Sequence, residues 1–306
     1  MARYATIDVG SNSVLLLVAE KTAEGFVTVE DRAELTRLGD GLEQTGRLSD
    51  VAMERTVQAL LDLARLAVEA HRVRGIAAVG TEALRTAVNG QELVQRVARE
   101  AAVTIHVVGG EEEARLSFLA VRSGLGVGDA PVAIFDVGGG STELILGRYG
   151  GMERRSSLRL GGLTLTERFL RSDPVAPDEL DRLRAHVDQV LAGDAARVEG
   201  DPRSVVGMGG AVTTLAAVSM GLEPYDPERV HGSTLSLEEV RRQVQLYRGK
   251  TVDERRALAG LHPRRADTIL CGAVITAAMM GWLGAETLTV SDRGIRHGLM
   301  EDRFGV

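Results

Sequence analysis

The chain has 306 residues, of which 44% are apolar and 26% charged, and its formal net charge is −7. This length predicts about two domains, and the apolar fraction excludes intrinsic disorder. The acidic balance and a content of only ten aromatic residues disfavour nucleic-acid binding. Cys271 is the only cysteine, so internal disulfides are excluded. A reducing, cytoplasmic location is expected, because the N-terminus also shows no signal-peptide pattern.

The first part of the chain alternates strands and helices. Expected strands are Tyr4–Asp8, Val14–Ala19, Phe26–Glu30, Ile76–Val79 and Ile105–Val108. Expected helices are Asp50–Arg72, Gln91–Ala101 and Glu111–Val121. A tight Gly10-Ser11-Asn12 turn is expected between the first two strands.

From Pro131 the alternation starts again. Strands are predicted at Val132–Val137, Thr142–Leu146 and Leu288–Val290. A helix is predicted at Pro177–Leu191, and two more are predicted after a glycine turn at Gly207–Gly210 and after a capping box at Ser236–Glu239. A last helix is predicted at the C-terminus, with Arg293, Arg296 and His297. The apolar run Ile269–Ala285 is short for a bilayer span. It predicts a helix buried in a core or between subunits, and no membrane association.

Two segments of the sequence repeat each other. Ile7-Asp-Val-Gly-Ser-Asn-Ser13 and Phe135-Asp-Val-Gly-Gly-Gly-Ser141 share apolar, Asp, Val, Gly and Ser positions in the same order. Each copy is expected to join two strands through a turn of small residues. The repetition predicts two similar α/β lobes, each contributing one turn to a cleft between them.

Turns of small residues suit phosphate binding, because consecutive backbone N–H groups form an anion-binding nest. The hydroxyls of Ser13, Ser141 and Thr142 add donors. The matched pair of turns therefore favours a phosphate chain held from both sides over two ordinary hairpins. The chain lacks the Walker-type and dinucleotide-type glycine motifs.

Carboxylates flank both turns. Asp8, Asp136 and Glu143 are hard oxygen ligands of the kind that hold Mg²⁺ beside phosphates. The alternative, strongest for Asp8, is an aspartate that hydrogen-bonds its own turn. The Glu111-Glu112-Glu113 cluster follows a strand and Gly109-Gly110. One of these glutamates is therefore a candidate for deprotonating a water molecule that attacks phosphorus. The alternative is that the three glutamates form a solvated cap at the start of a helix. The histidines show no metal-ligand spacing.

Six motifs resemble those of the exopolyphosphatase / guanosine pentaphosphate phosphohydrolase (Ppx/GppA) family. They are Ala5–Ser13, Gly80–Arg85, Gly109–Arg115, Phe135–Glu143, Gly207–Ala211 and Ser291–Gly298, and the match runs in the right order from about residue 4 to about residue 300. The resemblance implies two duplicated ribonuclease-H-like lobes of the actin, sugar-kinase and heat-shock-ATPase superfamily, with an interlobe cleft. We expect an N-terminal lobe at 1–124, onto which a C-terminal helix at about 296–306 packs back, and a second lobe at 125–295.

The resemblance also implies Mg²⁺-dependent release of terminal phosphate from inorganic polyphosphate, with short chains favoured. By motif position, Glu113 is the catalytic glutamate, and Asp136 and Glu143 are the metal-side acids. The implied phosphate contacts are Asn12, Ser13, Arg85, Gly138, Gly139, Gly140 and Ser141, with Gly209 and Gly210 in the turn that meets a nucleoside in some relatives. The chain lacks the extra C-terminal domains of longer relatives and carries Arg293 where a small residue is common.

Three alternatives stay open from the sequence. The nearest is a phosphohydrolase acting on guanosine pentaphosphate or a nucleoside triphosphate. The second is a non-catalytic polyphosphate or nucleotide sensor, which Glu113 and the two acids disfavour. The third is a sugar-kinase-like transferase, for which no acceptor-site insertion is evident. A homodimer is expected, with the Ala/Gly-rich helix from Ile269 as a candidate interface.

Overall fold

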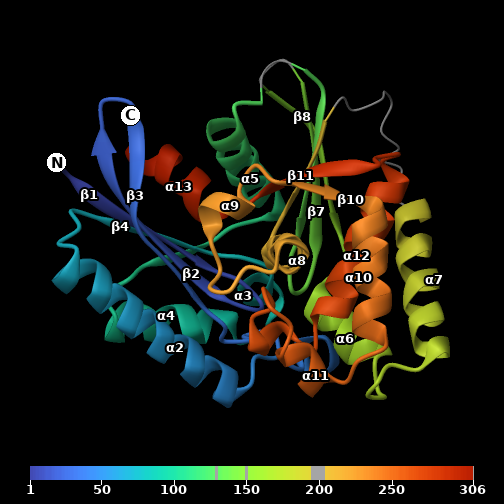
Figure 1. Cartoon of the computed structure of the whole chain (residues 1–306). Helices are drawn as coiled ribbons and strands as arrows, with labels where there is room; N and C mark the ends of the chain where they lie inside the picture. The colour runs from blue at the N-terminus through green and yellow to red at the C-terminus, as the bar shows by residue number, and fades with distance from the viewer. Residues whose placement is uncertain (128–129, 149–150, 194–203, 306) are drawn as a thin grey trace. The chain divides into compact units, whose positions relative to one another are not determined.

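The computed structural model describes residues 1–127, 130–148, 151–193 and 204–305, which divide into two compact units. Unit 1 comprises Met1–Ala120 and Gly294–Val306, and unit 2 comprises Val121–Arg293 (Figure 1). The boundary falls within one helix, α5 (Gly110–Leu125).

Unit 1 is built on a five-stranded sheet of order β3-β2-β1-β4-β5. Its strands are β1 (Arg3–Val9), β2 (Val14–Thr22), β3 (Gly25–Glu34), β4 (Ile76–Gly80) and β5 (Ile105–Val107). Its helices are α1 (Leu42–Thr45), α2 (Asp50–Arg65), a π-helical turn η1 (Leu66–Ala70), α3 (Glu82–Thr86), α4 (Gly90–Glu100), most of α5, and α13 (Ile295–Phe304). Strands β1, β4 and β5 are parallel, whereas β2 and β3 form antiparallel hairpins with their neighbours.

The alternation of side chains along β2 assigns helices to the two faces of this sheet. Leu16 and Val18 pack with the apolar residues of α2 and α4, whereas Leu17 and Ala19 pack with Met300 of α13. Figure 1 shows the ribbons of these helices beside the sheet of unit 1. Thr6 of β1 also donates a hydrogen bond of 2.7 Å to the carbonyl of Arg296. The C-terminal helix is therefore an integral layer of unit 1.

Unit 2 is built on a six-stranded sheet of order β10-β11-β9-β6-β7-β8. Its strands are β6 (Val132–Val137), β7 (Thr142–Arg148), β8 (Gly151–Leu158), β9 (Ser204–Met208), β10 (Thr234–Ser236) and β11 (Thr287–Ser291). Its helices are α6 (Gly162–Phe169), α7 (Pro177–Gly193), α8 (Gly210–Met220), α9 (Pro227–Val230), α10 (Leu237–Arg248), α11 (Val252–Arg256), the 3₁₀ turn η2 (Pro263–Arg265) and α12 (Ile269–Trp282).

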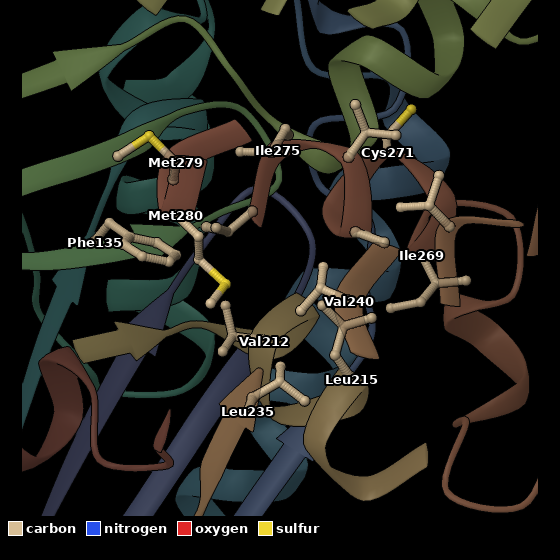
Figure 2. Close-up of a cluster of buried hydrophobic side chains, with 14 of the residues drawn as sticks. Phe135, Val212, Leu215, Leu235, Val240, Ile269, Cys271, Ile275, Met279 and Met280 are labelled. Atoms are coloured by element: carbon tan, nitrogen blue, oxygen red, sulfur yellow. The ribbon is translucent and has the colours of Figure 1, made fainter. Parts of the chain in front are cut away.

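The core of unit 2 surrounds α12. Figure 2 shows Ile269, Cys271, Ile275, Met279 and Met280 of this helix among side chains from β6, α8, β10 and α10. The thiol of Cys271 is fully buried, and burial raises its pKa to about 12. The predicted buried helix is therefore confirmed, and the structure assigns the helix to the core of its own unit. No helix in the described residues is long and apolar enough to cross a membrane.

The duplication predicted from the sequence is confirmed by topology. The order β3-β2-β1-β4-β5 of unit 1 matches β8-β7-β6-β9-β11 of unit 2, with the same parallel and antiparallel pairings. Strand β10 is an antiparallel addition to the edge in unit 2. Equivalent positions of the two copies can therefore be compared residue by residue.

Several local predictions need correction. The long helix after Asp50 ends as an α-helix at Arg65 and continues only as the π-helical turn to Ala70. Gly207 lies in β9, so the turn before α8 shrinks to Gly209. Ser236 caps α10, but Glu239 pairs with Arg242 and Gln243 and does not complete a capping box. Strand β8 and helix α6 are not predicted from the sequence, and both support the site described below.

Candidate active site

The two repeated turns have the same internal hydrogen bond. The Gly10 N–H donates to the Ser13 carbonyl at 2.9 Å, and the Gly138 N–H donates to the Ser141 carbonyl at 2.9 Å. Each bond closes a tight turn between antiparallel strands, β1 and β2 in unit 1 and β6 and β7 in unit 2. The sequence repeat is therefore a repeat of backbone conformation as well.

A second segment supports each turn by donating to its carbonyls. In unit 1, the N–H groups of Arg37 and Gly39 donate to the carbonyls of Asn12 and Ser11 at 2.9 and 2.8 Å. In unit 2, the first residues of α6 do so: Gly162 donates to Gly138 and Leu163 to Gly139, both at 2.9 Å. The carbonyls are thus used by the protein's own backbone.

The N–H groups of the turns are left without such partners. Within the described residues, the backbone N–H groups of Ser11, Asn12 and Ser13, and of Gly139, Gly140 and Ser141, donate no hydrogen bond. Consecutive unbonded N–H groups of a supported turn form a nest that favours anions. Each unit therefore carries a turn whose unbonded N–H groups suit an anion.

Arg85 and Glu113 lie together in unit 1. Arg85 belongs to the short helix α3. Its Nη1 contacts Glu113 Oε1 of α5 and donates to the Val108 carbonyl at 2.8 Å. The Glu113 side chain is 4% exposed and that of Arg85 is 31% exposed. Arg85 therefore pairs with the predicted catalytic glutamate.

The three glutamates at the start of α5 have different surroundings. Glu111 is exposed. Glu112 forms a bidentate pair with Arg115, at 2.7 and 2.8 Å, and Arg115 also bonds Asp302 of α13 at 2.7 Å. The Arg115–Asp302 pair joins helices α5 and α13 of unit 1. Only Glu113 is buried.

The pKa values of the two neighbouring acids shift in opposite directions. The Arg115 guanidinium lowers the pKa of Glu112. Burial raises the pKa of Glu113, and Arg85 opposes this rise with a hydrogen bond and its charge. Opposed shifts of adjacent acids are typical of a site in which one carboxylate exchanges protons. Glu113 is the member of the cluster whose surroundings suit a base.

Asp136 and Glu143 lie directly opposite each other on β6 and β7. Directly opposed residues of antiparallel strands lie on one face of the sheet, and two like charges there repel. Two carboxylates with water and substrate phosphate as further ligands are the usual protein contribution to a Mg²⁺ site. The donor chemistry of this pair therefore fits Mg²⁺, although no group of three His, Cys, Asp or Glu side chains suited to a metal occurs in the described residues.

Asp8 occupies the position in unit 1 that Asp136 occupies in unit 2. It is 8% exposed, and it faces Leu15 across the strand pair where Asp136 faces Glu143. The copy in unit 1 therefore has no second carboxylate in the equivalent row.

The Gly209–Gly210 turn lies beside Asp136. Gly209 has a φ of +90°, and a Cβ there would approach Asp136 Oδ1 to 2.5 Å. Next to it, the guanidinium of Arg265 lies over Gly210, at the N-terminus of α8. An arginine at a helix N-terminus adds to a region that already favours anions. Arg265 is not predicted from the sequence, because no motif surrounds it.

The C-terminal motif has a structural part. Arg296 forms a bidentate pair with Asp31 of β3, with its closest contact at 2.8 Å, and the nearly buried His297 lies 3.9 Å from the same carboxylate. Arg293 precedes α13, which corrects its predicted place in the C-terminal helix, and its side chain packs against Gly124.

Each copy of the α/β fold carries a nest of unbonded N–H groups, and one copy also carries a buried glutamate. This combination is typical of proteins that bind and process phosphate compounds. The sequence matches the model of the Ppx/GppA phosphatase family over residues 17–304, and the chain belongs to this family. The resemblance of its motifs and the duplicated α/β fold class are thereby confirmed.

Relatives of known sequence or structure cover nearly the whole chain. It is 34% identical to exopolyphosphatase 2 of Mycobacterium tuberculosis over 313 aligned residues, 98% of each chain. An exopolyphosphatase from Cytophaga hutchinsonii superposes with a TM-score of 0.90 at 28% identity, covering 99% of this chain and 98% of that one. The Ppx/GppA family member of Aquifex aeolicus superposes with a TM-score of 0.82 at 33% identity, covering 98% and 97%.

Proposed function

We propose that this phosphatase is an exopolyphosphatase that releases terminal phosphate from inorganic polyphosphate and favours short chains. The names of its relatives from Mycobacterium tuberculosis and Cytophaga hutchinsonii support this substrate. The observation that carries the proposal is the pair of supported turns with unbonded N–H groups. A polymer of phosphates suits a protein that has duplicated its phosphate-binding turn.

In this proposal the two turns bind phosphate oxygens. Asn12 and Ser13 act in unit 1, and Gly138, Gly139, Gly140 and Ser141 act in unit 2. The Ser141 hydroxyl donates to Glu143 at 2.6 Å, so its N–H is the group assigned to phosphate. Arg85 adds a guanidinium that can contact two phosphate oxygens, while its neighbour Glu113 stays within reach.

Glu113 is assigned the role of general base. Its carboxylate accepts a proton from a water molecule as that water's oxygen forms a bond to the terminal phosphorus, and the bond from phosphorus to the bridging oxygen breaks. Burial raises the pKa of Glu113, which strengthens it as a base at neutral pH. Arg85 opposes this rise and so favours the ionised form of the base.

Asp136 and Glu143 are assigned to Mg²⁺, with Asp8 as a further candidate from unit 1. When bound, Mg²⁺ would offset the negative charge that builds on the phosphate oxygens. Asp136 and Glu143 repel each other across the strand pair, and a bound cation would offset that repulsion. A net charge of −7 makes this neutralisation more important, because the substrate is a polyanion.

A second candidate substrate is guanosine pentaphosphate or a nucleoside triphosphate. The observation that favours it is Arg265 over Gly210, beside Gly209, because the N-terminus of α8 is then a further place for an anion. This turn corresponds to the one that meets a nucleoside in some members of the family.

The test compares phosphate release from short polyphosphate, long polyphosphate, guanosine pentaphosphate and ATP at one free Mg²⁺ concentration. We expect the largest kcat/KM on short polyphosphate. A larger kcat/KM on guanosine pentaphosphate would replace the first substrate by the second. The cytoplasmic location and the homodimer remain predictions, and sedimentation of the purified chain tests the latter.

A further inference from the structure

A row of three polar residues crosses unit 2. Asp136 on β6 pairs in register with Glu143 on β7, and Glu143 pairs in register with Ser157 on β8. Residues paired in this way lie on the same face of a sheet. Ser157 therefore extends the acidic pair by one strand, on a strand that the sequence did not reveal.

Two hydroxyl groups converge on one oxygen of Glu143. The Ser141 Oγ donates to Glu143 Oε1 at 2.6 Å, and the Ser157 Oγ donates to the same atom at 3.0 Å. Glu143 is only 7% exposed. A carboxylate with two donors on one oxygen has little freedom to rotate, so its orientation relative to Asp136 is fixed before any ligand arrives.

The other copy of the fold provides an internal comparison. The equivalent row in unit 1 is Asp8, Leu15 and Ala33 on β1, β2 and β3. Only the aspartate is shared, and neither the second carboxylate nor the hydroxyl is present there. The glutamate and its serine therefore occur together in one copy and are absent together from the other.

We propose that Ser157 is a positioning residue that orients Glu143 for a divalent cation held with Asp136. This inference rests on the metal role assigned to the two acids above. Ser157 is a cleaner probe of that role than Ser141, because Ser141 also belongs to the phosphate-binding turn, whereas Ser157 lies on a different strand. Groups that orient a metal ligand typically contribute 10- to 100-fold to metal affinity or activity.

The experiment measures Mn²⁺ binding by electron paramagnetic resonance in the absence of substrate. Ser157→Ala should raise the dissociation constant about 10-fold. It should raise the Mg²⁺ concentration for half-maximal phosphate release by a similar factor, while kcat at saturating Mg²⁺ stays near the parental value. Ser157→Thr keeps the hydroxyl and should restore both values. Ser156→Ala is the matched control, because Ser156 pairs with Leu144 and lies on the opposite face of β8.

The variant Glu143→Gln distinguishes the metal role of Glu143 from the positioning role of Ser157. If this variant weakens Mn²⁺ binding and a folded Ser157→Ala variant binds Mn²⁺ like the parent, the positioning role is refuted and the metal role stands. If Glu143→Gln itself binds Mn²⁺ like the parent, the metal assignment is refuted and the role of Ser157 with it. Failure of Ser157→Thr to restore binding would likewise overturn the role of the hydroxyl. Because no substrate is present, these outcomes do not depend on which phosphate compound the enzyme hydrolyses.

Discussion

Replacing Gly161 with alanine tests whether the second turn binds phosphate through its backbone. Gly161 is the N-cap of α6, and its φ and ψ of −113° and 140° are accessible to alanine. A Cβ at this position would lie 2.2 Å from the Gly139 carbonyl oxygen and 2.3 and 2.4 Å from the carbonyl carbon and Cα of Gly140. The substitution therefore acts on the turn and not on the conformation of residue 161.

The size of the effect follows from these distances. Contacts of Cβ atoms below 3.0 Å essentially do not occur, so the turn and the start of α6 must separate by at least 0.6–0.8 Å. All the atoms involved are backbone atoms, so no side-chain rotation relieves the clash. Overpacking of this kind costs about 1–3 kcal/mol of stability. A displacement near 1 Å at a substrate-positioning group costs about 10²-fold in rate.

Gly162 offers the matched control, one residue further along. A Cβ there would meet its nearest neighbours at 3.7–4.0 Å, which is ordinary contact. We expect Gly161→Ala to lower kcat/KM for short polyphosphate about 100-fold at fixed free Mg²⁺, and Gly162→Ala to remain within a few-fold of the parent. Thermal melting of both variants checks that they fold. Parental kinetics in a folded Gly161→Ala variant, or equal losses in both, would refute phosphate binding by this turn.

Four further predictions concern the charged groups. Glu113→Gln should lower kcat by about 10²–10⁴-fold with little change in substrate binding, because it removes the base and keeps the shape; loss of binding in equal measure would argue against a base. The rate should fall with decreasing pH at a pH above the ordinary pKa of a glutamate, because burial raises the pKa of Glu113 and only its ionised form accepts a proton. Arg85→Ala should move this acid limb to still higher pH, because Arg85 lowers that pKa, and it should raise KM about tenfold; an unmoved limb in the pH–rate profile would mean that the pair does not form in solution. Asp136→Asn should raise the Mg²⁺ concentration for half-maximal activity, and a metal titration that overlays the parental one would make Asp136 a structural residue.

The sequence predicts those parts of the fold that short continuous segments encode. The repeated segments around Asp8 and Asp136 share residue letters, so the duplication and both turns can be recognised by comparing the two segments alone. The helical phase of α5 could also have singled out Glu113, since Glu113, Leu116, Ser117 and Ala120 are all buried and follow helical spacing.

Other features depend on register and packing, which single segments do not encode. Strand β8 is an edge strand whose residues are mostly polar and exposed, so its apolar pattern is weak. The proposed role of Ser157 follows only from its pairing with Glu143. The approach of Gly161 to the turn joins residues about twenty positions apart through the placement of α6. Arg265 reaches Gly210 from more than fifty positions away. These contacts arise from the tertiary fold, and no local sequence motif predicts them.

The discontinuity of unit 1 has a consequence for biosynthesis. Helix α13 is made after the whole of unit 2, yet it covers the face of the first sheet formed by Tyr4, Leu17 and Ala19, and Tyr4 stacks on Phe304 at 4.4 Å. On the ribosome, unit 2 can complete its continuous chain while that apolar face of unit 1 still lacks its cover. Residues that follow unit 2 in the chain therefore complete unit 1, and the sheet face of Tyr4, Leu17 and Ala19 gains this cover only once α13 has been translated.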